Sequence, residues 1–238
     1  MNIAIVTARA GSKSIKNKNV YPVLGKPLIA YPIEAAKQAA RVDRVYVSTD
    51  GLAIAEAAEA LGCQIIWRPE ELAGDHVNHG DVIKHAVEAV DRPELENVVV
   101  LLGNTVVVDA ALIDEGLRLL AERSDVDSVM SVWEAADDHP LRALEIRDGF
   151  LAPYGDPNRR ASTERQSYPP AYYYDQGIWA FRKACVQSRD GPNPWWWMGR
   201  RCLPIVRPWV TGRDVHSHLD LDLAAWWLTA PHAASLKT

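Results

Sequence analysis

Short apolar runs alternate with segments of helical periodicity through the first hundred residues, and this alternation restricts the fold more than any other feature. The apolar runs are nearly continuous, which is typical of parallel strands covered by helices on both faces. The pattern therefore predicts a three-layer α/β fold around a mostly parallel sheet. The expected strands are residues 3–6, 44–50, 63–68 and 97–104, and the expected helices are residues 27–40, 52–62 and 80–90.

An insert interrupts this rhythm at about residues 135–174. A helical pattern at residues 111–124 and a strand-like run at residues 128–134 precede it, and the rhythm resumes at residues 177–186. The insert is rich in Pro, Arg and Tyr, side chains that a partner or substrate uses, so we expect a hairpin and an extended arm. A surface loop is the alternative. Residues 1–238 then form a single domain that carries this insert.

A strongly basic turn, residues 7–19, directly follows the first expected strand. It holds one arginine and three lysines, although the chain has a formal net charge of -5 at pH 7. Ligands of such sheets bind beyond the carboxyl ends of the strands, where the turns at Thr49–Asp50, Arg68–Pro69 and Gly103–Asn104 also lie. Local positive charge suits a small anion. Nucleic acids and membranes need a broad basic face, so we expect neither as a partner.

The residues of this turn are those of an anion-binding loop. Gly11 and Ser12 let backbone N–H groups point into the concavity, and the next helix adds its N-terminus. Arg9, Lys13 and Lys18 can then surround a triphosphate, with a solvated run of lysines as the alternative. The spacings of the P-loop and of GxGxxG are absent, which argues against an NTPase of that class and against a dinucleotide dehydrogenase.

Cys63, Cys185 and Cys202 are odd in number, far apart and form no CxxC pair. A disulfide framework or a thiolate zinc site is therefore not expected, whereas a reducing cytosol is. No basic leader precedes the first strand, and no apolar run approaches the roughly 18 residues of a membrane span. These observations predict a soluble, cytoplasmic protein.

Four segments carry a resemblance to a known family: VTARAGSKSIKNKNVYPVLGKPLIAYPIEAA, DRVYVSTD, RPEELAGD and HPLRALEI. In that order they resemble the motifs of the acylneuraminate cytidylyltransferases, which are the CMP-sialic acid synthetases and their relatives for other acidic sugars. The resemblance covers nearly the whole chain. It implies a Rossmann-like nucleotidyltransferase sheet with an inserted dimerisation hairpin. It also implies transfer of CMP from CTP to an acidic acceptor, with release of pyrophosphate.

The resemblance also implies where the nucleotide binds. Arg68 matches an arginine that helps to hold the cytosine, with a surface arginine before a proline as the alternative. His79 stands where relatives usually carry a serine near the ribose, and Asp75 where the family also has an aspartate. The catalytic residues are Arg9, Lys13, Lys18 and Asp214, and the nucleotide-binding residues are Ala8, Arg9, Gly11, Ser12, Lys13, Lys18, Asn19, Arg68, Val77 and His79.

The metal motif of the family resembles D-I-D-T-E-x-D-L, and the matching stretch here is DVHSHLDL. Asp214 and His216 stand at the two metal-binding aspartates, and Asp220 matches the later aspartate. Mg²⁺ is the implied cofactor, but imidazole suits Mn²⁺ better than Mg²⁺, so Mn²⁺ is the alternative. Another register would pair Asp220 with Asp222, and a capping or surface role is the alternative for His216.

The acceptor side departs most from the family. LLGNTVVVD replaces L-L-Q-P-T-S-P-L-R, and YYYDQG replaces F-R-P-N-G, where the arginine meets the carboxylate of the sugar. The implied acceptor is a nonulosonic, ketodeoxy or smaller acid other than N-acetylneuraminate. The alternatives are a phosphonate or sugar-phosphate acceptor, or a catalytically silent nucleotide-binding homologue. The acceptor-binding residues are Asn104, Thr105, Arg165, Gln166, Tyr174 and Gln176.

Two further features bear on assembly. His139-Pro140 matches a turn in the dimer-forming part of relatives, so the resemblance implies a homodimer whose arm reaches toward the neighbour's site. Trp195, Trp196 and Trp197 form an aromatic run near the acceptor side. These tryptophans either close over the acceptor or pack at a subunit interface.

Overall fold

The computed structural model describes residues 1–90, 92–155, 164 and 167–230. Within these residues one seven-stranded sheet, in the order β11-β7-β10-β6-β1-β4-β5, forms the centre. Its pairs are parallel except those of β10, which runs antiparallel to β6 and β7. The predicted mostly parallel sheet is confirmed. Its strands are β1 (Asn2–Thr7), β4 (Arg44–Thr49), β5 (Gln64–Trp67), β6 (Asn97–Leu102), β7 (Ser128–Glu134), β10 (Tyr172–Arg182) and β11 (Cys202–Arg207).

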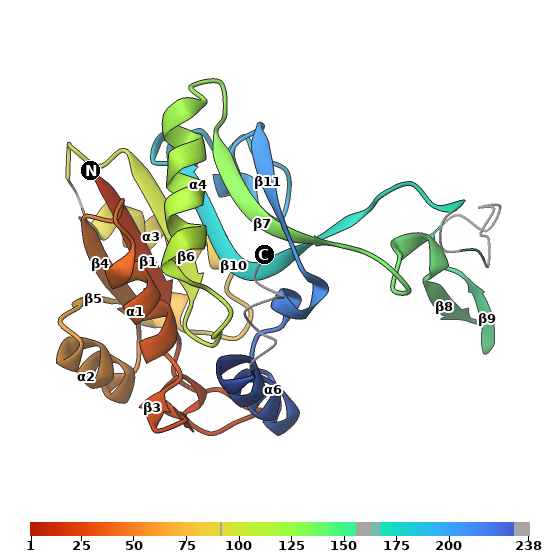
Figure 1. Cartoon of the computed structure of the whole chain (residues 1–238), viewed down its shortest axis with the longest axis horizontal. Helices are drawn as coiled ribbons and strands as arrows, with labels where there is room; N and C mark the ends of the chain where they lie inside the picture. Colours follow the sequence, from red (N-terminus) through yellow and green to blue (C-terminus); the bar gives the residue numbers. More distant parts are fainter. Residues whose placement is uncertain (91, 156–163, 165–166, 231–238) are drawn as a thin grey trace.

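Helices cover both faces of this sheet, as the side chains of β1 demonstrate. Ile3 and Ile5 are buried against α3 and the Trp196–Met198 segment, whereas Ala4 and Val6 are buried against α1, α2 and α4 (Figure 1). The alternation follows from the two-residue period of a strand. No helix of the described residues is both long and apolar enough to cross a membrane. The helices are α1 (Ala30–Gln38), α2 (Leu52–Ala60), α3 (His79–Val90), α4 (Ala110–Glu122), α5 (Ala184–Ser188) and α6 (His218–Thr229).

Strand β10 starts earlier than the sequence pattern predicts, because Tyr172–Tyr174 already pair with β7. The pairing shifts between Tyr174 and Trp179, where the chain bulges. Asp175, which is fully buried in this bulge, accepts a hydrogen bond from the amide of Gly177 at 2.8 Å. The strand therefore begins in the insert. The bulge interrupts the alternation of apolar and polar residues, so the sequence pattern does not show that the strand is continuous.

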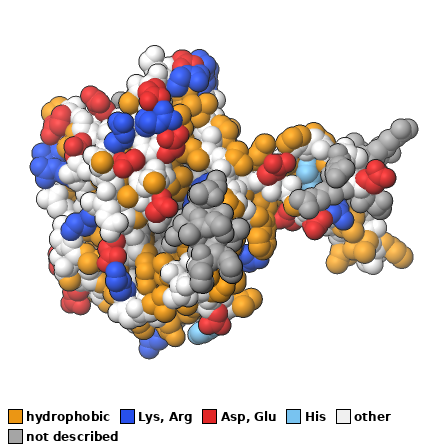
Figure 2. Space-filling view, in the orientation of Figure 1, with side chains coloured by type: hydrophobic (Ala, Val, Ile, Leu, Met, Phe, Trp, Pro, Cys, Tyr) orange, Lys and Arg blue, Asp and Glu red, His pale blue; other side chains and the backbone are white. Residues whose placement is uncertain are grey.

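The insert contains the expected hairpin, formed by β8 (Leu144–Arg147) and β9 (Phe150–Pro153). It stands well away from the main body in Figure 1, and apolar side chains gather on its surface in Figure 2. Ile146 and Leu151 pair across it and are 77% and 72% exposed. A smaller hairpin, β2 (Pro22–Val23) and β3 (Lys26–Pro27), follows the basic turn.

The aromatic run, Trp195–Trp197, was expected to close over the acceptor or to pack at a subunit interface, and two of its three tryptophans do neither. Trp196 and Trp197 are buried in the core beneath the sheet, next to Phe181 and Trp179. Only Trp195 is partly exposed, with its ring 5.2 Å from that of Tyr174. Trp196 and Trp197 therefore serve the core instead of a ligand or a subunit interface, because burying an indole is more favourable than leaving it in water.

Candidate active site

The basic turn folds back over the end of β1 and is held by side-chain hydrogen bonds. Asp50, after β4, accepts from the amide of Ala10 at 2.7 Å, and Asn19 donates to the carbonyl of Arg9 at 3.0 Å. Gly11 has a φ of +70°, in the left-handed region that favours glycine. These contacts shape the turn so that its cations line a cleft.

Two of these cations converge on one carboxylate. Arg9 and Lys13 each form an ion pair with Asp75, at 2.5 Å to different carboxylate oxygens. The hydrogen bonds from Lys13 and Arg9 lower the pKa of Asp75 to about 2. A phosphate presents oxygens to the same donors, so Asp75 occupies the place of an anionic ligand in this structure.

Lys18 links the turn to the end of the chain. Its Nζ donates to the carbonyl of Val215 at 2.7 Å. Burial lowers the pKa of Lys18, while the neighbouring carboxylate of Asp214 acts in the opposite direction. The sequence motif and the last part of the chain, almost 200 residues apart, thus meet at one ammonium group.

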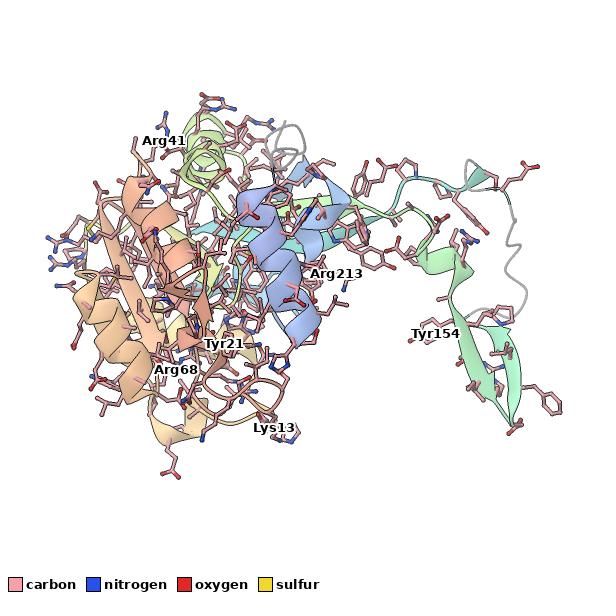
Figure 3. The ribbon with its side chains drawn as sticks, turned by 60° about the horizontal axis from the view of Figure 1, so that its bottom comes forward. Lys13, Tyr21, Arg41, Arg68, Tyr154 and Arg213 are labelled. Atoms are coloured by element: carbon pink, nitrogen blue, oxygen red, sulfur yellow. The ribbon has the colours of Figure 1, made fainter. Side chains whose placement is uncertain are left out.

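Arg68 and His79 form another wall of the cleft. Arg68 donates to the hydroxyl and carbonyl of Ser48, at 2.9 and 2.8 Å, and burial lowers its pKa to about 10. The ring of His79 forms a hydrogen bond with Thr7 Oγ1 at 3.0 Å. Figure 3 shows Arg68 and Lys13 at the same edge of the sheet and Arg41 at the opposite edge.

Asn104, Asp214 and His216 form a connected group after β6 and before α6. The amide of Asn104 donates to Asp214 Oδ2 at 2.6 Å, and His216 Nε2 lies 2.9 Å from Asp214 Oδ1. The preceding Gly103 has no room for a side chain, since a Cβ atom there would lie 2.7 Å from the Cβ atom of Ala8. The glutamine of the family could therefore not replace Gly103 without a shift of this turn.

A cleft of about 420 Å³ connects these groups, and its volume is within the range of about 300–1,000 Å³ typical of small-molecule sites. Most predicted nucleotide-binding residues line this cleft, as does Asn104, and we name it the phosphate-binding cleft after the role predicted for its cations. Gly11 shapes the turn without lining the cleft, and Asp214 lies beside it. The predicted residues in the lining are Ala8, Arg9, Ser12, Lys13, Lys18, Asn19, Arg68, Val77, His79, Asn104 and His216.

Three of the remaining predicted acceptor residues, Thr105, Tyr174 and Gln176, do not line this cleft. Thr105 is fully buried, and its hydroxyl accepts from the amide of Val107 at 3.3 Å, so its side chain supports the turn. Tyr174 packs against Trp179 and Trp195, and like Gln176 it is absent from the lining of the cleft. Arg165 and Gln166 lie outside the described residues.

Sequence reasoning missed several residues of the lining. Thr7 and Ser14 offer hydroxyl groups from the basic turn itself, and proximity to Arg9 and Lys13 could have indicated both. Asp75 also belongs to the lining, and only the structure reveals its two ion pairs. The apolar members Leu72 and Val82 carry no signal that distinguishes them from ordinary core residues.

The donor set next to the cleft fits a divalent cation that is shared with phosphates. Among the described residues, no group of three or more His, Cys, Asp or Glu side chains is arranged to hold a metal alone. Mg²⁺ commonly takes only one or two protein carboxylates together with substrate phosphates, and Asp214 supplies such a carboxylate. Asp220 is engaged elsewhere, because its Oδ2 accepts from the amides of His216 and Ser217 at 3.0 and 2.7 Å.

The fold and the site define an open α/β protein with a cationic cleft at the carboxyl edge of its sheet, the edge at which such proteins bind their ligands. A family model described as cytidylyltransferase matches residues 3–185, and the chain belongs to that family. The N-acylneuraminate cytidylyltransferase of Escherichia coli O18:K1:H7 is 37% identical over 226 residues, 93% of this chain and 51% of that protein. The resemblance found in the sequence motifs is confirmed.

One further relative agrees with this assignment, and a solved structure shares the fold. A Helicobacter pylori protein, named as a pseudaminic acid cytidylyltransferase and UDP-2,4-diacetamido-2,4,6-trideoxy-beta-L-altropyranose hydrolase, is 26% identical over 76% of this chain and 34% of that protein. The chain thus spans a third to a half of the length of these two relatives. The structure of CMP:2-keto-3-deoxy-manno-octonic acid synthetase with CTP has the same fold, with a TM-score of 0.69 and 17% identity over 95% of this chain and 98% of that chain.

Proposed function

We propose that this chain transfers CMP from CTP to an acidic sugar acceptor and releases pyrophosphate. The phosphate-binding cleft carries the proposal, because Arg9, Lys13 and Lys18 approach one space beside Asp214. The names of the relatives, which act on N-acylneuraminate and pseudaminic acid, support an acid as the acceptor.

The proposed reaction is a single displacement at the α-phosphorus. The oxygen of an acceptor hydroxyl forms the new P–O bond and its proton passes to solvent, while the bond to the bridging oxygen breaks and pyrophosphate leaves with the electron pair. Negative charge grows on the leaving group, so Arg9, Lys13 and Lys18 stabilise the transition state more than the ground state. The ion pairs of Asp75 with Arg9 and Lys13 break when the phosphates bind, because the carboxylate and the phosphates use the same donors.

Asp214 and His216 are the residues that would hold the divalent cation. The cation would supply positive charge to the phosphates when bound. The carboxylate of Asp214 suits Mg²⁺, and the imidazole of His216 suits Mn²⁺ better. We therefore propose Mg²⁺ or Mn²⁺ as the cofactor, with a stronger preference for Mn²⁺ than a site of two aspartates would have.

A homodimer in the cytoplasm is part of the proposal. Ile146 and Leu151 are exposed on a two-stranded hairpin, and an isolated hairpin is marginally stable in water. A second copy of the chain would cover this surface. Cys63, Cys185 and Cys202 are all free thiols, as is usual in a reducing compartment.

Pyrophosphate release with CTP tests the proposed function. The acceptors are N-acetylneuraminate, N,N′-diacetyllegionaminate, 3-deoxy-octulosonate and a small phosphonate, each with Mg²⁺ and with Mn²⁺. We expect release that depends on CTP and on at least one sugar acid. Release with the phosphonate alone would indicate another acceptor class, and CTP binding without any release would contradict the proposed transfer.

Lys18 offers a matched test within the same turn. Lys18→Ala should lower kcat/KM for CTP at least about tenfold, ~1.4 kcal/mol of barrier, because an ammonium near the phosphates is lost. Lys16→Ala is the control, since Lys16 is exposed and does not belong to the lining of the cleft. Equal losses in the two variants, measured at equal folded fractions, would remove Lys18 from the phosphate site.

A further inference from the structure

A second cleft, of about 280 Å³, adjoins the phosphate-binding cleft at His216. His216 lines both clefts, and Asp214 lines the second. A molecule in the second cleft can therefore reach a nucleotide in the first across these two side chains. Trp133 and Trp209 provide aromatic walls for such a molecule.

Arg213 is the one cation among the described residues that line this second cleft. Its guanidinium lies 5.7 Å from the ring centroid of Trp209, and it forms no ion pair with any residue that the structure describes. The planar fork of an arginine matches a carboxylate. Asp138, Asp214 and Asp220 repel an anion from the rest of the cleft, which leaves Arg213 as the position for a negatively charged group.

Asp220 does not neutralise Arg213 by direct pairing. Its Oδ2 accepts three hydrogen bonds, from the amides of His216 and Ser217 and from the hydroxyl of Ser217. These bonds serve the start of α6, which is a capping box between Ser217 and Asp220. The positive charge of Arg213 acts on the Asp220 carboxylate and helps to lower its pKa, but the two side chains form no direct ion pair among the described residues, so the N–H groups of Arg213 can bind a ligand.

An apolar cavity of about 100 Å³ adjoins this arginine. Trp209, Arg213, Asp214 and Asp220 line both the cavity and the second cleft. The rest of its wall is mostly apolar and includes Val107 and Val106, and Val106 stands at the serine of the family's L-L-Q-P-T-S-P-L-R motif. A space of this size with mostly apolar walls accommodates a methyl or acyl group, and the carboxylates of Asp214 and Asp220 disfavour a negatively charged group there.

We propose that Arg213 binds the carboxylate of the acceptor, and that the apolar cavity receives an uncharged substituent of the same molecule. This inference rests on the proposed function. The family's arginine for this carboxylate is replaced by Tyr174, whose ring packs against Trp179 and Trp195 and lines neither cleft. The substrate class is a sugar acid that carries both a carboxylate and an apolar substituent.

The test uses Arg213→Ala and Arg213→Lys in the full chain, with N,N′-diacetyllegionaminate and 3-deoxy-octulosonate as probes. The first acid carries acyl groups and the second lacks them. We expect the wild-type protein to have at least a tenfold higher kcat/KM for the acylated acid. Arg213→Ala should raise the KM for that acid about tenfold or more and leave the KM for CTP within about twofold, and Arg213→Lys should restore part of the affinity. Arg41→Ala, at the opposite edge of the sheet (Figure 3), is the control and should change neither constant.

The outcomes separate this inference from the proposed function. A wild-type protein that does not bind CTP, or that releases no pyrophosphate with any acid, would overturn the proposed function. Pyrophosphate release with an unchanged acceptor KM in Arg213→Ala, or a preference for the acid without acyl groups, overturns this inference alone. If CTP binds without turnover, both acids are titrated onto the CTP complex of the wild-type protein and of Arg213→Ala. Equal affinity of the two proteins for the acids would overturn the inference on Arg213.

Discussion

His79 illustrates how the site depends on the charge state of a single residue. Its ring packs edge-on against Trp179, with centroids 5.3 Å apart, and forms a hydrogen bond with Thr7. Burial lowers the pKa of His79 to about 4, and the positive charge of Arg68 acts in the same direction. The neutral ring therefore lines the phosphate-binding cleft without adding to its charge at pH 7.

The pKa of His79 predicts a pH dependence of stability. The unfolded chain protonates this histidine below about pH 6.5, whereas the folded chain does so only near pH 4. The free energy of unfolding should thus fall as the pH drops from about 6.5 to 4, by about 1–3 kcal/mol for this group. Urea unfolding should show a flatter curve for His79→Gln, and the exposed His76→Gln should keep the wild-type slope. Equal slopes for His79→Gln and the wild-type protein would contradict this account.

The basic turn could be predicted at the level of residues because its chemistry is local in the sequence. Arg9, Lys13 and Lys18 lie within ten residues, directly after a strand whose end is the binding edge. The contact of Asp75 with two of them could not be predicted, since it joins segments more than 60 residues apart. Arg213 was missed for a related reason: its neighbourhood forms only when β7, the segment Trp209–Gly212 and α6 come together.

At the scale of elements, the strands and helices of the first hundred residues follow directly from their periodicity. Apolar runs such as residues 97–102 are buried on both faces and have few alternatives to a central strand. The start of β10 could not be predicted in this way, because its bulge depends on the buried ion pair of Asp175 with Arg207 at 3.0 Å. That pair is a tertiary contact and leaves no periodic signal.

The capping box of α6 is a testable device at this scale. Ser217→Ala removes the side-chain acceptor and donor that hold Asp220, so it should lower the free energy of unfolding by about 1 kcal/mol and Tm by about 2–4 °C. Calorimetry measures both. Thr229→Ala, at the other end of the same helix, is the control and should shift Tm by less than half as much. A loss no larger for Ser217→Ala than for Thr229→Ala would show that the cap does not stabilise the helix.

At the scale of the whole molecule, the projecting arm exposes apolar side chains that no other part of the described chain covers. One face of its hairpin presents Leu144, Ile146 and Leu151, each more than half exposed. Two strands bury too little surface to hold such a face in water by themselves. Exposed apolar patches of this kind are characteristic of protein interfaces, and the arm projects away from the main body of the chain (Figure 1).

Ile146→Asp should therefore convert the proposed dimer into monomers. A carboxylate in a desolvated interface without a partner is strongly unfavourable, so the dissociation constant should rise by about a hundredfold or more. Sedimentation equilibrium measures it across a range of protein concentrations. Leu52→Asp places the same charge on an exposed apolar residue of α2, on the opposite side of the molecule from the arm, and should leave the dimer intact. A wild-type protein that is monomeric at all concentrations, or a dimer that both variants weaken equally, would exclude the hairpin as the interface. CTP binding by monomeric Ile146→Asp is expected to persist, because the phosphate-binding cleft is built from residues of one chain.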